Sequence, residues 1–493
     1  MKIKKTIYFS TFILFVMNIL CKIIAFFRDI MLSYFYGASK ISDSYLIAIS
    51  IPTVIFTGVV SALLTSYIPV ANKINNKDKI NEFNNNLITS FTLFGLICSI
   101  LLYFQSNNIV HFFGAGLKEE SYLLAVHFTE IIIWCIPYLT IGYLFVAILQ
   151  YKEEYLYVGM NGMILNLIML FGIIISILNI DILPFSTLFG YILQCLIYGV
   201  VLCYKGYKYK VYLNLHDKNL LYILKVMFPI FVGQIVSELN NVVDKNLASR
   251  LCEGTITSLD YSHKVIVACH SFVIIPLSTI LFTKIAKKIS TNIQNVRESV
   301  LKTTSIAFCI LLPINILIYV YANNIISLLF FRGAFNYNSL VITSECLKMY
   351  SLGMLPFSLR TILEKVFYAD ADSKTPMLNS AIGVLSNMGL SLLLVTKFKH
   401  LGLTLASSIS MWFIFALFTY KLKVNYKLFT KKYILVILFS CLDFFVLIGV
   451  YFIVNSLFYM LEIIKIIITI LLFMIIQIIW YYLYNKMTIK LNL

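Results

Sequence analysis

The sequence predicts an all-α polytopic membrane protein with about fourteen transmembrane helices, arranged as two six-helix lobes in a parallel pseudo-repeat plus two C-terminal helices. Three observations predict this class: the composition, a succession of apolar runs and an internal repeat. Of 493 residues, 60% are hydrophobic and 12% are charged, and that charged fraction is roughly half of what a soluble domain carries. Fourteen spans of about 20 residues would occupy about 280 residues and leave short loops.

Apolar runs place the individual spans along the chain. The first follows the N-terminal MKIKK, and it is predicted to stay as an uncleaved helix because no small-x-small cleavage site follows it. The predicted spans are 6–27, 43–70, 86–104, 123–150, 157–178, 182–204, 219–243, 261–283, 302–322, 340–364, 376–396, 400–420, 433–455 and 460–484.

The basic residues predict the orientation of these spans. With the N-terminus inside, the cytoplasmic segments hold 25 Lys and Arg and the outer segments hold eight. Such a bias is typical of cytoplasmic loops, so both termini are predicted to be cytoplasmic. The same bias explains most of the formal net charge of +17, so the sequence does not predict a nucleic-acid partner.

An internal repeat at an offset near 217 predicts the two lobes. Six spans per repeat give both halves the same topology, with an axis along the membrane normal, and this architecture suits alternating access. The predicted lobes are 1–215 and 216–428, followed by a helix pair at 429–493. The matching segments are FYGASKISDSY (35–45) with LCEGTITSLDY (251–261), HFFGAG (111–116) with LFFRGAF (329–335), and ILQYKEEY (148–155) with KVFYADAD (365–372).

No feature of the sequence predicts an enzyme. Loops are short, and GxxxxGK[ST], HExxH and GxSxG are absent. The ten cysteines are scattered without a CxxC pair, so they predict neither a disulfide framework nor a metal site.

Ionisable residues inside or beside the spans are the candidate functional residues, because a charge in the bilayer costs a few kcal/mol. Several alternatives stay open: Lys22 could reach the membrane surface, and Arg28 with Asp29 could be an interfacial ion pair. Arg360 with Glu364, spaced i, i+4, could equally be a structural pair. The candidate substrate-binding residues are Lys22, Arg28, Asp29, Asp43, Lys264 and Arg360.

A cavity lined by these cations would favour an anionic substrate, and phosphate is the usual match for such clusters. An inside-negative potential favours outward movement of negative charge by about 2.3 kcal/mol per charge per 100 mV. The sequence therefore predicts an exporter of a phosphorylated compound.

Four motifs resemble the MurJ/MviN lipid II flippases, a family of the multidrug/oligosaccharidyl-lipid/polysaccharide exporter superfamily. They are CKIIAFFRDIMLSYFYGASKISDSYLIAISIP (21–52), VDKNLASRLCEGTITSLDYSHKV (243–265), FFRGAF (330–335) and FYADADSKTP (367–376). The resemblance implies a fourteen-span fold and a substrate, the undecaprenyl-diphosphate-linked peptidoglycan precursor, moved from the inner to the outer leaflet. It also implies that residues 433–484 form a groove for the lipid tail.

Carried over residue by residue, the resemblance places the family's cationic position of the first span on Lys22 and its Arg-Asp pair on Arg28 and Asp29. Its aspartate at the start of span two falls on Asp43, and its span-eight cation on Lys264. Neutral residues stand where family members usually carry charge: Ser50, Phe56, Thr57, Ser61 and Val267.

The expected function is therefore a lipid II flippase for cell-wall synthesis that works by alternating access in the bacterial cell membrane. The alternatives are a flippase for another polyprenyl-diphosphate-linked saccharide of capsule, O-antigen or teichoic type, and a cation-coupled drug exporter. No cofactor is expected, and the membrane potential or a monovalent cation are the candidate driving forces. Expected partners are the polyprenyl-diphosphate-linked glycan, the lipid bilayer and the cell-wall synthesis machinery.

Overall fold

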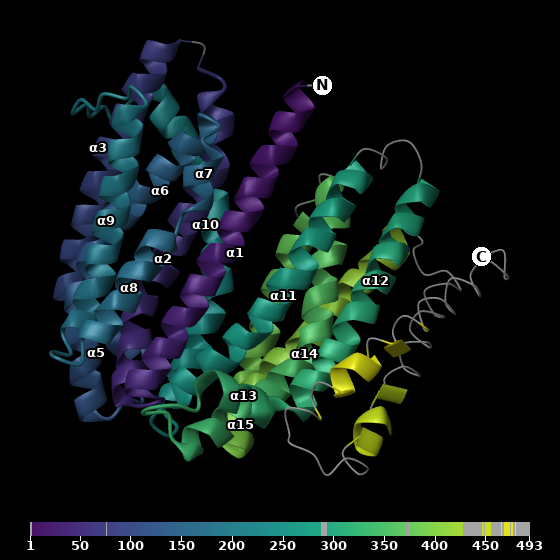
Figure 1. The fold of residues 1–493 in the computed structure, drawn as a ribbon. Helices are drawn as coiled ribbons and strands as arrows, with labels where there is room; N and C mark the ends of the chain where they lie inside the picture. Colours follow the sequence, from purple (N-terminus) through teal and green to yellow (C-terminus); the bar gives the residue numbers. More distant parts are fainter. Residues whose placement is uncertain are drawn as a thin grey trace. The chain divides into compact units, whose positions relative to one another are not determined.

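A computed structural model describes residues 2–74, 76–286, 293–370, 372 and 374–426, with short stretches between 446 and 479. These residues are helical with connecting turns, and no strand occurs among them. The chain divides into two compact units (Figure 1). Unit 1 comprises Met1–Thr257 with Phe330–Ser339, and unit 2 comprises Ser258–Leu329 with Leu340–Leu493.

Unit 1 contains the helices of the predicted N-lobe together with the next long helix, α10. Helix α2 is its centre and packs against α10, α5 and α6, while α8 packs against α1 and α9. Its helices are α1 (Lys2–Tyr36), α2 (Lys40–Ala71), α3 (Lys77–Phe104), α4 (Ser106–Phe113), α5 (Glu119–Ile132), the 3-10 turn η1 (Ile133–Cys135), α6 (Ile136–Tyr151), α7 (Tyr155–Gly159), α8 (Met163–Ile175), α9 (Ile182–Tyr204) and α10 (Lys218–Ser249).

In unit 2, hydrogen bonds join α14 to α12 and to α15. The Asn315 amide on α12 donates to the Ser351 carbonyl at 2.5 Å, and the Trp412 indole on α15 donates to the Leu352 carbonyl at 2.9 Å. The helices are α11 (Thr255–Ala286), α12 (Ile293–Val320), α13 (Ala322–Phe330), α14 (Tyr337–Ala369) and α15 (Lys374–Tyr426).

These helices account for the first twelve predicted spans. Helix α15 holds two of them, because its backbone breaks at Lys399 (φ 51°, ψ −128°), within the turn predicted between 396 and 400. Spans 433–455 and 460–484 lie largely outside the described residues. The helices extend beyond several of the predicted spans. Helix α1 continues past 27 to Tyr36, so Arg28 and Asp29 lie inside the helix.

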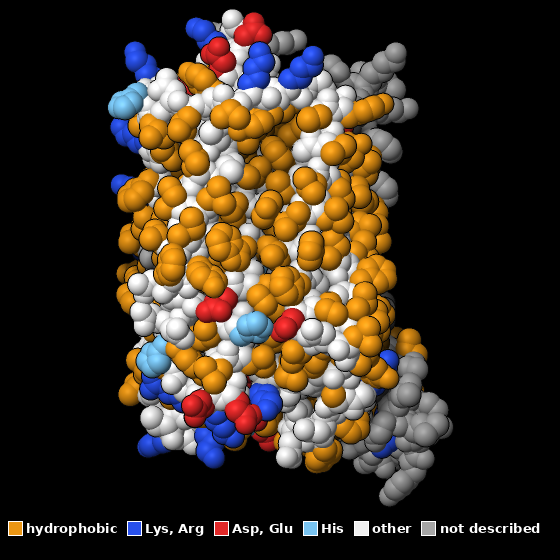
Figure 2. Space-filling model, turned by 90° about the vertical axis from the view of Figure 1, so that its left-hand side faces the viewer, with side chains coloured by type: hydrophobic (Ala, Val, Ile, Leu, Met, Phe, Trp, Pro, Cys, Tyr) orange, Lys and Arg blue, Asp and Glu red, His pale blue; other side chains and the backbone are white. Residues whose placement is uncertain are grey.

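Seven of the described helical segments are long and apolar enough to cross a membrane: Lys40–Ala71, Asp78–Phe104, Glu119–Tyr151, Ile182–Tyr204, Lys218–Ser249, Lys302–Val320 and Lys374–Leu422. Figure 2 shows the consequence on one face, where hydrophobic side chains form a broad band between two ends that carry Lys, Arg, Asp and Glu. A band of this kind is what a bilayer requires, because polar side chains are costly in the hydrocarbon region.

Two short helices support the internal repeat. Helix α4 and helix α13 each follow the third long helix of their half. Both contain Asn-Asn-Ile, at 107–109 and 323–325, an offset of 216 that agrees with the motif pairs. The repeated sequence thus corresponds to a repeated order of helices.

Candidate functional site

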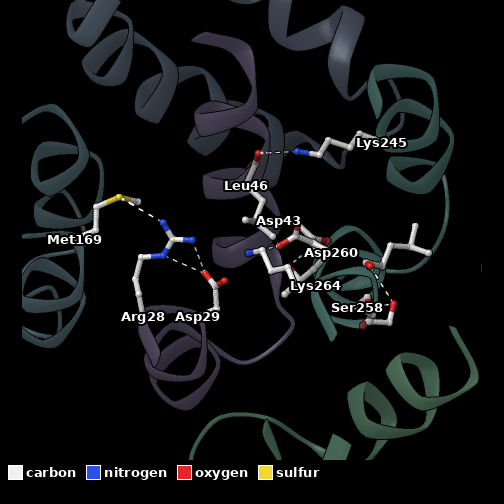
Figure 3. A network of polar contacts seen from close by, with 12 residues as sticks. Arg28, Asp29, Asp43, Leu46, Met169, Lys245, Ser258, Asp260 and Lys264 are labelled. Carbon is white, nitrogen blue, oxygen red and sulfur yellow. Dashed lines mark hydrogen bonds and ion pairs between the residues drawn. The ribbon is translucent and has the colours of Figure 1, made fainter. Parts of the chain in front are cut away.

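Arg28 and Asp29 form an ion pair on α1 that a third residue extends to α8. The Arg28 Nη2 lies 2.7 Å from Asp29 Oδ1, and Nε donates to the same oxygen at 3.1 Å. Arg28 Nη1 donates to Asn166 Oδ1 at 2.8 Å and lies 3.6 Å from the Met169 sulfur. Figure 3 shows the guanidinium between Asp29 and Met169.

The Asn166 side chain is itself oriented. Its amide nitrogen donates to the Gly162 carbonyl at 2.7 Å, which leaves the amide oxygen directed at Arg28. Gly162 precedes α8 with φ +86°, a conformation that glycine adopts without steric cost. The Asp29 side chain is 5% exposed and that of Arg28 is 19% exposed, so the pair is partly shielded from solvent and the planar guanidinium is held in one orientation.

Sequence reasoning did not identify Asn166. The available signal was a polar amide within the apolar run MILNLIML, where a buried amide needs hydrogen-bond partners. Lys22 lies on the same helix as Arg28 and is exposed. Lys22 has no ion pair among the described residues. The two alternatives for this lysine, reaching the membrane surface or contacting the substrate, both stay predictions.

Asp43 is buried near the start of α2 and bonds to the turn that opens α11. One carboxylate oxygen accepts from the Gly254 N–H at 2.7 Å. The other accepts from the Thr257 N–H at 2.8 Å and from the Thr257 hydroxyl at 2.6 Å. The residue is 3% exposed. A carboxylate at a helix N-terminus satisfies backbone N–H groups and complements the helix dipole, so Asp43 holds the α11 turn in place.

The same region brings together three motifs that lie far apart in the sequence. The turn at Gly37 lies against the Gly254 turn and the Gly333 turn, all in unit 1. A Cβ on Gly37 would be 2.4 Å from the Ala334 carbonyl oxygen, and one on Gly254 would be 2.4 Å from the Ala38 carbonyl oxygen. Both glycines have positive φ, +61° and +83°, so the close backbone approach explains the glycine in each motif.

Two further candidates lie in unit 2, each in an i, i+4 ion pair on its own helix. Lys264 Nζ is 2.6 Å from Asp260 Oδ2 on α11, with the two side chains 27% and 24% exposed. Arg360 Nε is 2.6 Å from Glu364 Oε1 on α14, and its Nη2 donates to the Ser380 hydroxyl at 3.4 Å. Arg360 and Glu364 thus form the ion pair that their spacing allows, and the role of Arg360 in substrate binding stays a prediction.

Of the neutral positions of α2, Ser50 and Phe56 are buried, and Thr57 and Ser61 are half-buried. Phe56 is 1% exposed and its ring lies 6.2 Å from that of Phe94. Ser50 is buried, and its hydroxyl donates to the Ile47 carbonyl at 2.7 Å. Thr57 likewise donates to the Thr53 carbonyl. Among the candidate residues, the structure pairs Arg28 with Asp29 and Lys264 with Asp260. A single cavity lined by both cations stays a prediction.

Comparisons with known proteins agree on one family. The family model described as "Lipid II flippase MurJ" matches residues 32–476. A relative named "Probable lipid II flippase MurJ" from Buchnera aphidicola subsp. Acyrthosiphon pisum is 28% identical over 421 residues, 82% of each chain. A relative of the same name from Thermotoga maritima is 25% identical over 433 residues, 86% of each chain.

Solved structures share the fold. "Lipid II flippase MurJ, inward closed conformation" matches with a TM-score of 0.85 at 23% identity, covering 97% of this chain and 99% of the other. An inward-facing multidrug resistance MATE family transporter of the MOP superfamily matches with a TM-score of 0.68 at 12% identity, covering 84% and 98%. Because the family model spans most of the chain, this protein belongs to the MurJ lipid II flippase family.

Proposed function

We propose that this protein moves lipid II, the undecaprenyl-diphosphate-linked peptidoglycan precursor, from the inner to the outer leaflet of the bacterial cell membrane. Membership of the family supports the proposal, as do the relatives that carry the name lipid II flippase. The protein acts as a transporter and performs no covalent chemistry. Both termini lie in the cytoplasm in this proposal, as the distribution of Lys and Arg favours.

The observation that carries the proposal is the Arg28 guanidinium, held by a carboxylate and an amide on two different helices. A planar guanidinium binds diphosphate oxygens through two parallel N–H bonds, and fixing its plane beforehand reduces the entropy lost on binding. We assign Lys22 and Lys264 as further contacts to the diphosphate, with Asp29 and Asp260 compensating the cations when no substrate is bound. Arg360 is the remaining candidate contact.

Transport in this proposal follows alternating access between the two lobes predicted from the sequence repeat. The diphosphate enters from the cytoplasmic side, and an inside-negative potential favours its outward movement by about 2.3 kcal/mol per charge per 100 mV. A monovalent cation is the alternative driving force. Cell-wall synthesis enzymes would consume the exported precursor.

The test is complementation in a bacterium whose own lipid II flippase can be depleted, with labelled lipid II measured in the outer leaflet. Arg28→Ala alone would remove the positive charge that neutralises the shielded Asp29 carboxylate, so the double variant Arg28→Ala/Asp29→Ala keeps the region neutral. We expect both variants and Lys264→Ala to lose at least tenfold in transport. Lys40→Ala is the control, because Lys40 forms an exposed ion pair with Glu120. Transport retained in Arg28→Ala/Asp29→Ala would overturn the assignment of Arg28.

One observation favours a second candidate, a flippase for another polyprenyl-diphosphate-linked saccharide. Positions that usually carry charge in the family hold the buried Phe56 and the backbone-bonded Ser50 and Thr57, so α2 offers fewer charges to a glycan. In the depletion strain, a wild-type protein that inserts but does not expose lipid II would favour this candidate. Accumulation of a different lipid-linked glycan on deletion in the native host would identify it.

A further inference from the structure

The segment that joins α9 to α10, residues 205–217, forms no helix or strand and is held along α3 by hydrogen bonds. We refer to it as the strap. The Tyr207 hydroxyl donates to Asn85 Oδ1 at 2.6 Å. Asn86 and Asn214 bond reciprocally, with the Asn214 N–H donating to Asn86 Oδ1 at 2.9 Å and the Asn86 amide donating to the Asn214 carbonyl at 2.8 Å. The Thr89 hydroxyl lies 2.9 Å from the Tyr209 hydroxyl.

These hydrogen bonds fix the strap rather than leave it as a loose loop. The three α3 residues that bind it are buried: Asn85 is 6% exposed, Asn86 is 0% and Thr89 is 8%. A buried amide that loses its partners is costly, so the run of asparagines on α3 selects this one path for the strap.

The strap contacts α3 at the point where the composition of that helix changes. The first ten residues of α3, KDKINEFNNN (77–86), are polar except for Ile80 and Phe83, and the next eighteen, LITSFTLFGLICSILLYF (87–104), are mostly apolar. The strap binds to residues 85–89, where one composition changes to the other. It also connects two candidate spans, Ile182–Tyr204 and Lys218–Ser249, at the ends of α9 and α10 (Figure 1).

The strap exposes side chains that a water-facing loop would not favour. Val211 is 81% exposed, Leu215 is 60% and Leu213 is 46%. Lys208 and Lys210 are exposed beside them. The exposed aliphatic side chains follow directly after the two lysines, beside the start of the apolar part of α3. This combination matches a surface that is apolar below and negatively charged above.

We propose that the strap is a binding surface for anionic phospholipid headgroups. Lys208 and Lys210 contact the phosphates, while Val211, Leu213 and Leu215 insert among the first carbons of the acyl chains. Lys205 contributes less to headgroup binding, because it already forms an ion pair with Glu154 at 2.5 Å. This inference goes beyond transport, since it concerns the lipids around the protein and not the substrate.

The experiment places a benzophenone amino acid at position 211 of the full-length protein. The protein is reconstituted in nanodiscs of equal phosphatidylglycerol and phosphatidylcholine, irradiated, and the lipid adducts are identified by mass spectrometry. We expect phosphatidylglycerol to be enriched over phosphatidylcholine by about fivefold per contacting lysine. In Lys208→Gln/Lys210→Gln, the adduct ratio should fall to the bulk ratio.

Two controls make the result specific. The benzophenone placed at Ile97, which is 56% exposed within the apolar part of α3, should form adducts at the bulk ratio. Lys79→Gln/Lys397→Gln removes the same charge from exposed positions elsewhere and should leave the enrichment at 211 unchanged. Absence of lipid adducts at 211 would overturn the proposal and indicate a strap that faces water or a cytosolic protein. Adducts at the bulk ratio in the wild-type protein would overturn it as well.

Discussion

The carboxylate of Asp43 supports the start of α11, and its removal should release that turn. Asp43→Ala leaves the Gly254 and Thr257 N–H groups without the acceptor to which they donate at 2.7 and 2.8 Å. A buried donor without a partner costs about 1–3 kcal/mol. Two such donors give a loss of about 4 kcal/mol in the free energy of opening the turn.

Amide hydrogen exchange followed by mass spectrometry measures this loss directly. A 4 kcal/mol change in the free energy of local opening corresponds to an exchange rate about a thousandfold faster. We expect the increase in the peptide that contains Gly254 and Thr257. Asp43→Asn keeps one acceptor oxygen but directs an amide N–H toward a donor. Its exchange rate at Gly254 and Thr257 should therefore lie between those of the wild type and of Asp43→Ala.

The matched control is Ser44→Ala at the neighbouring position. The Ser44 hydroxyl is also buried and donates to the Ser121 carbonyl at 2.8 Å, a neutral bond worth about 1 kcal/mol. Its removal should leave exchange at Gly254 and Thr257 unchanged. If Asp43→Ala also left these amides protected, the assignment of Asp43 as the group that holds the α11 turn would be wrong.

Three further predictions concern other positions. Gly37→Ala should lower the thermal unfolding temperature measurably, because the added Cβ would lie 2.4 Å from the Ala334 carbonyl oxygen at φ +61°; an unchanged temperature would contradict the close approach. Asp372 caps α15 by accepting from the Thr375 N–H at 3.0 Å, and hydrogen bonds from the Thr375 side chain and backbone lower the pKa of Asp372. Its stabilisation, about 1 kcal/mol or less, is present above the unfolded-state pKa and is lost as the pH falls through the lower folded-state value. The gap in unfolding temperature between wild type and Asp372→Ala should therefore close in acid. Arg28→Lys keeps the positive charge, but a single ammonium group cannot contact Asp29 and Asn166 through separate nitrogens as the guanidinium does. Transport should therefore fall about tenfold. Full activity would show that the charge alone suffices.

Local sequence determined much of the fold, because membrane insertion imposes simple local rules. Every span must be apolar for about 20 residues and must satisfy its backbone internally. The helix ends were less predictable. Helix α1 continues to Tyr36 through Arg28 and Asp29, because an ion pair completed by an amide on α8 makes these polar residues acceptable in a packed helix.

The contacts of the candidate site were likewise predictable only in part. The i, i+4 spacing of Arg360 and Glu364 predicted their ion pair, because neighbours on one helical face meet whatever the rest of the fold does. The role of Asp43 could not be predicted in this way. Its partners lie more than 200 residues away in the sequence, and composition does not reveal that a carboxylate faces a distant helix start.

The sequence by itself determined that this chain is a polytopic helical membrane protein built on a repeat, because hydrophobicity and motif spacing are local properties. Only the tertiary structure decided which polar groups that lie far apart in the sequence meet. It directed Asn166 at Arg28 and Asp43 at the α11 turn, and it placed Phe56 in the interior. Each of these outcomes depends on the packing of helices against one another, where a buried polar group must find a partner and an apolar ring must find neighbours.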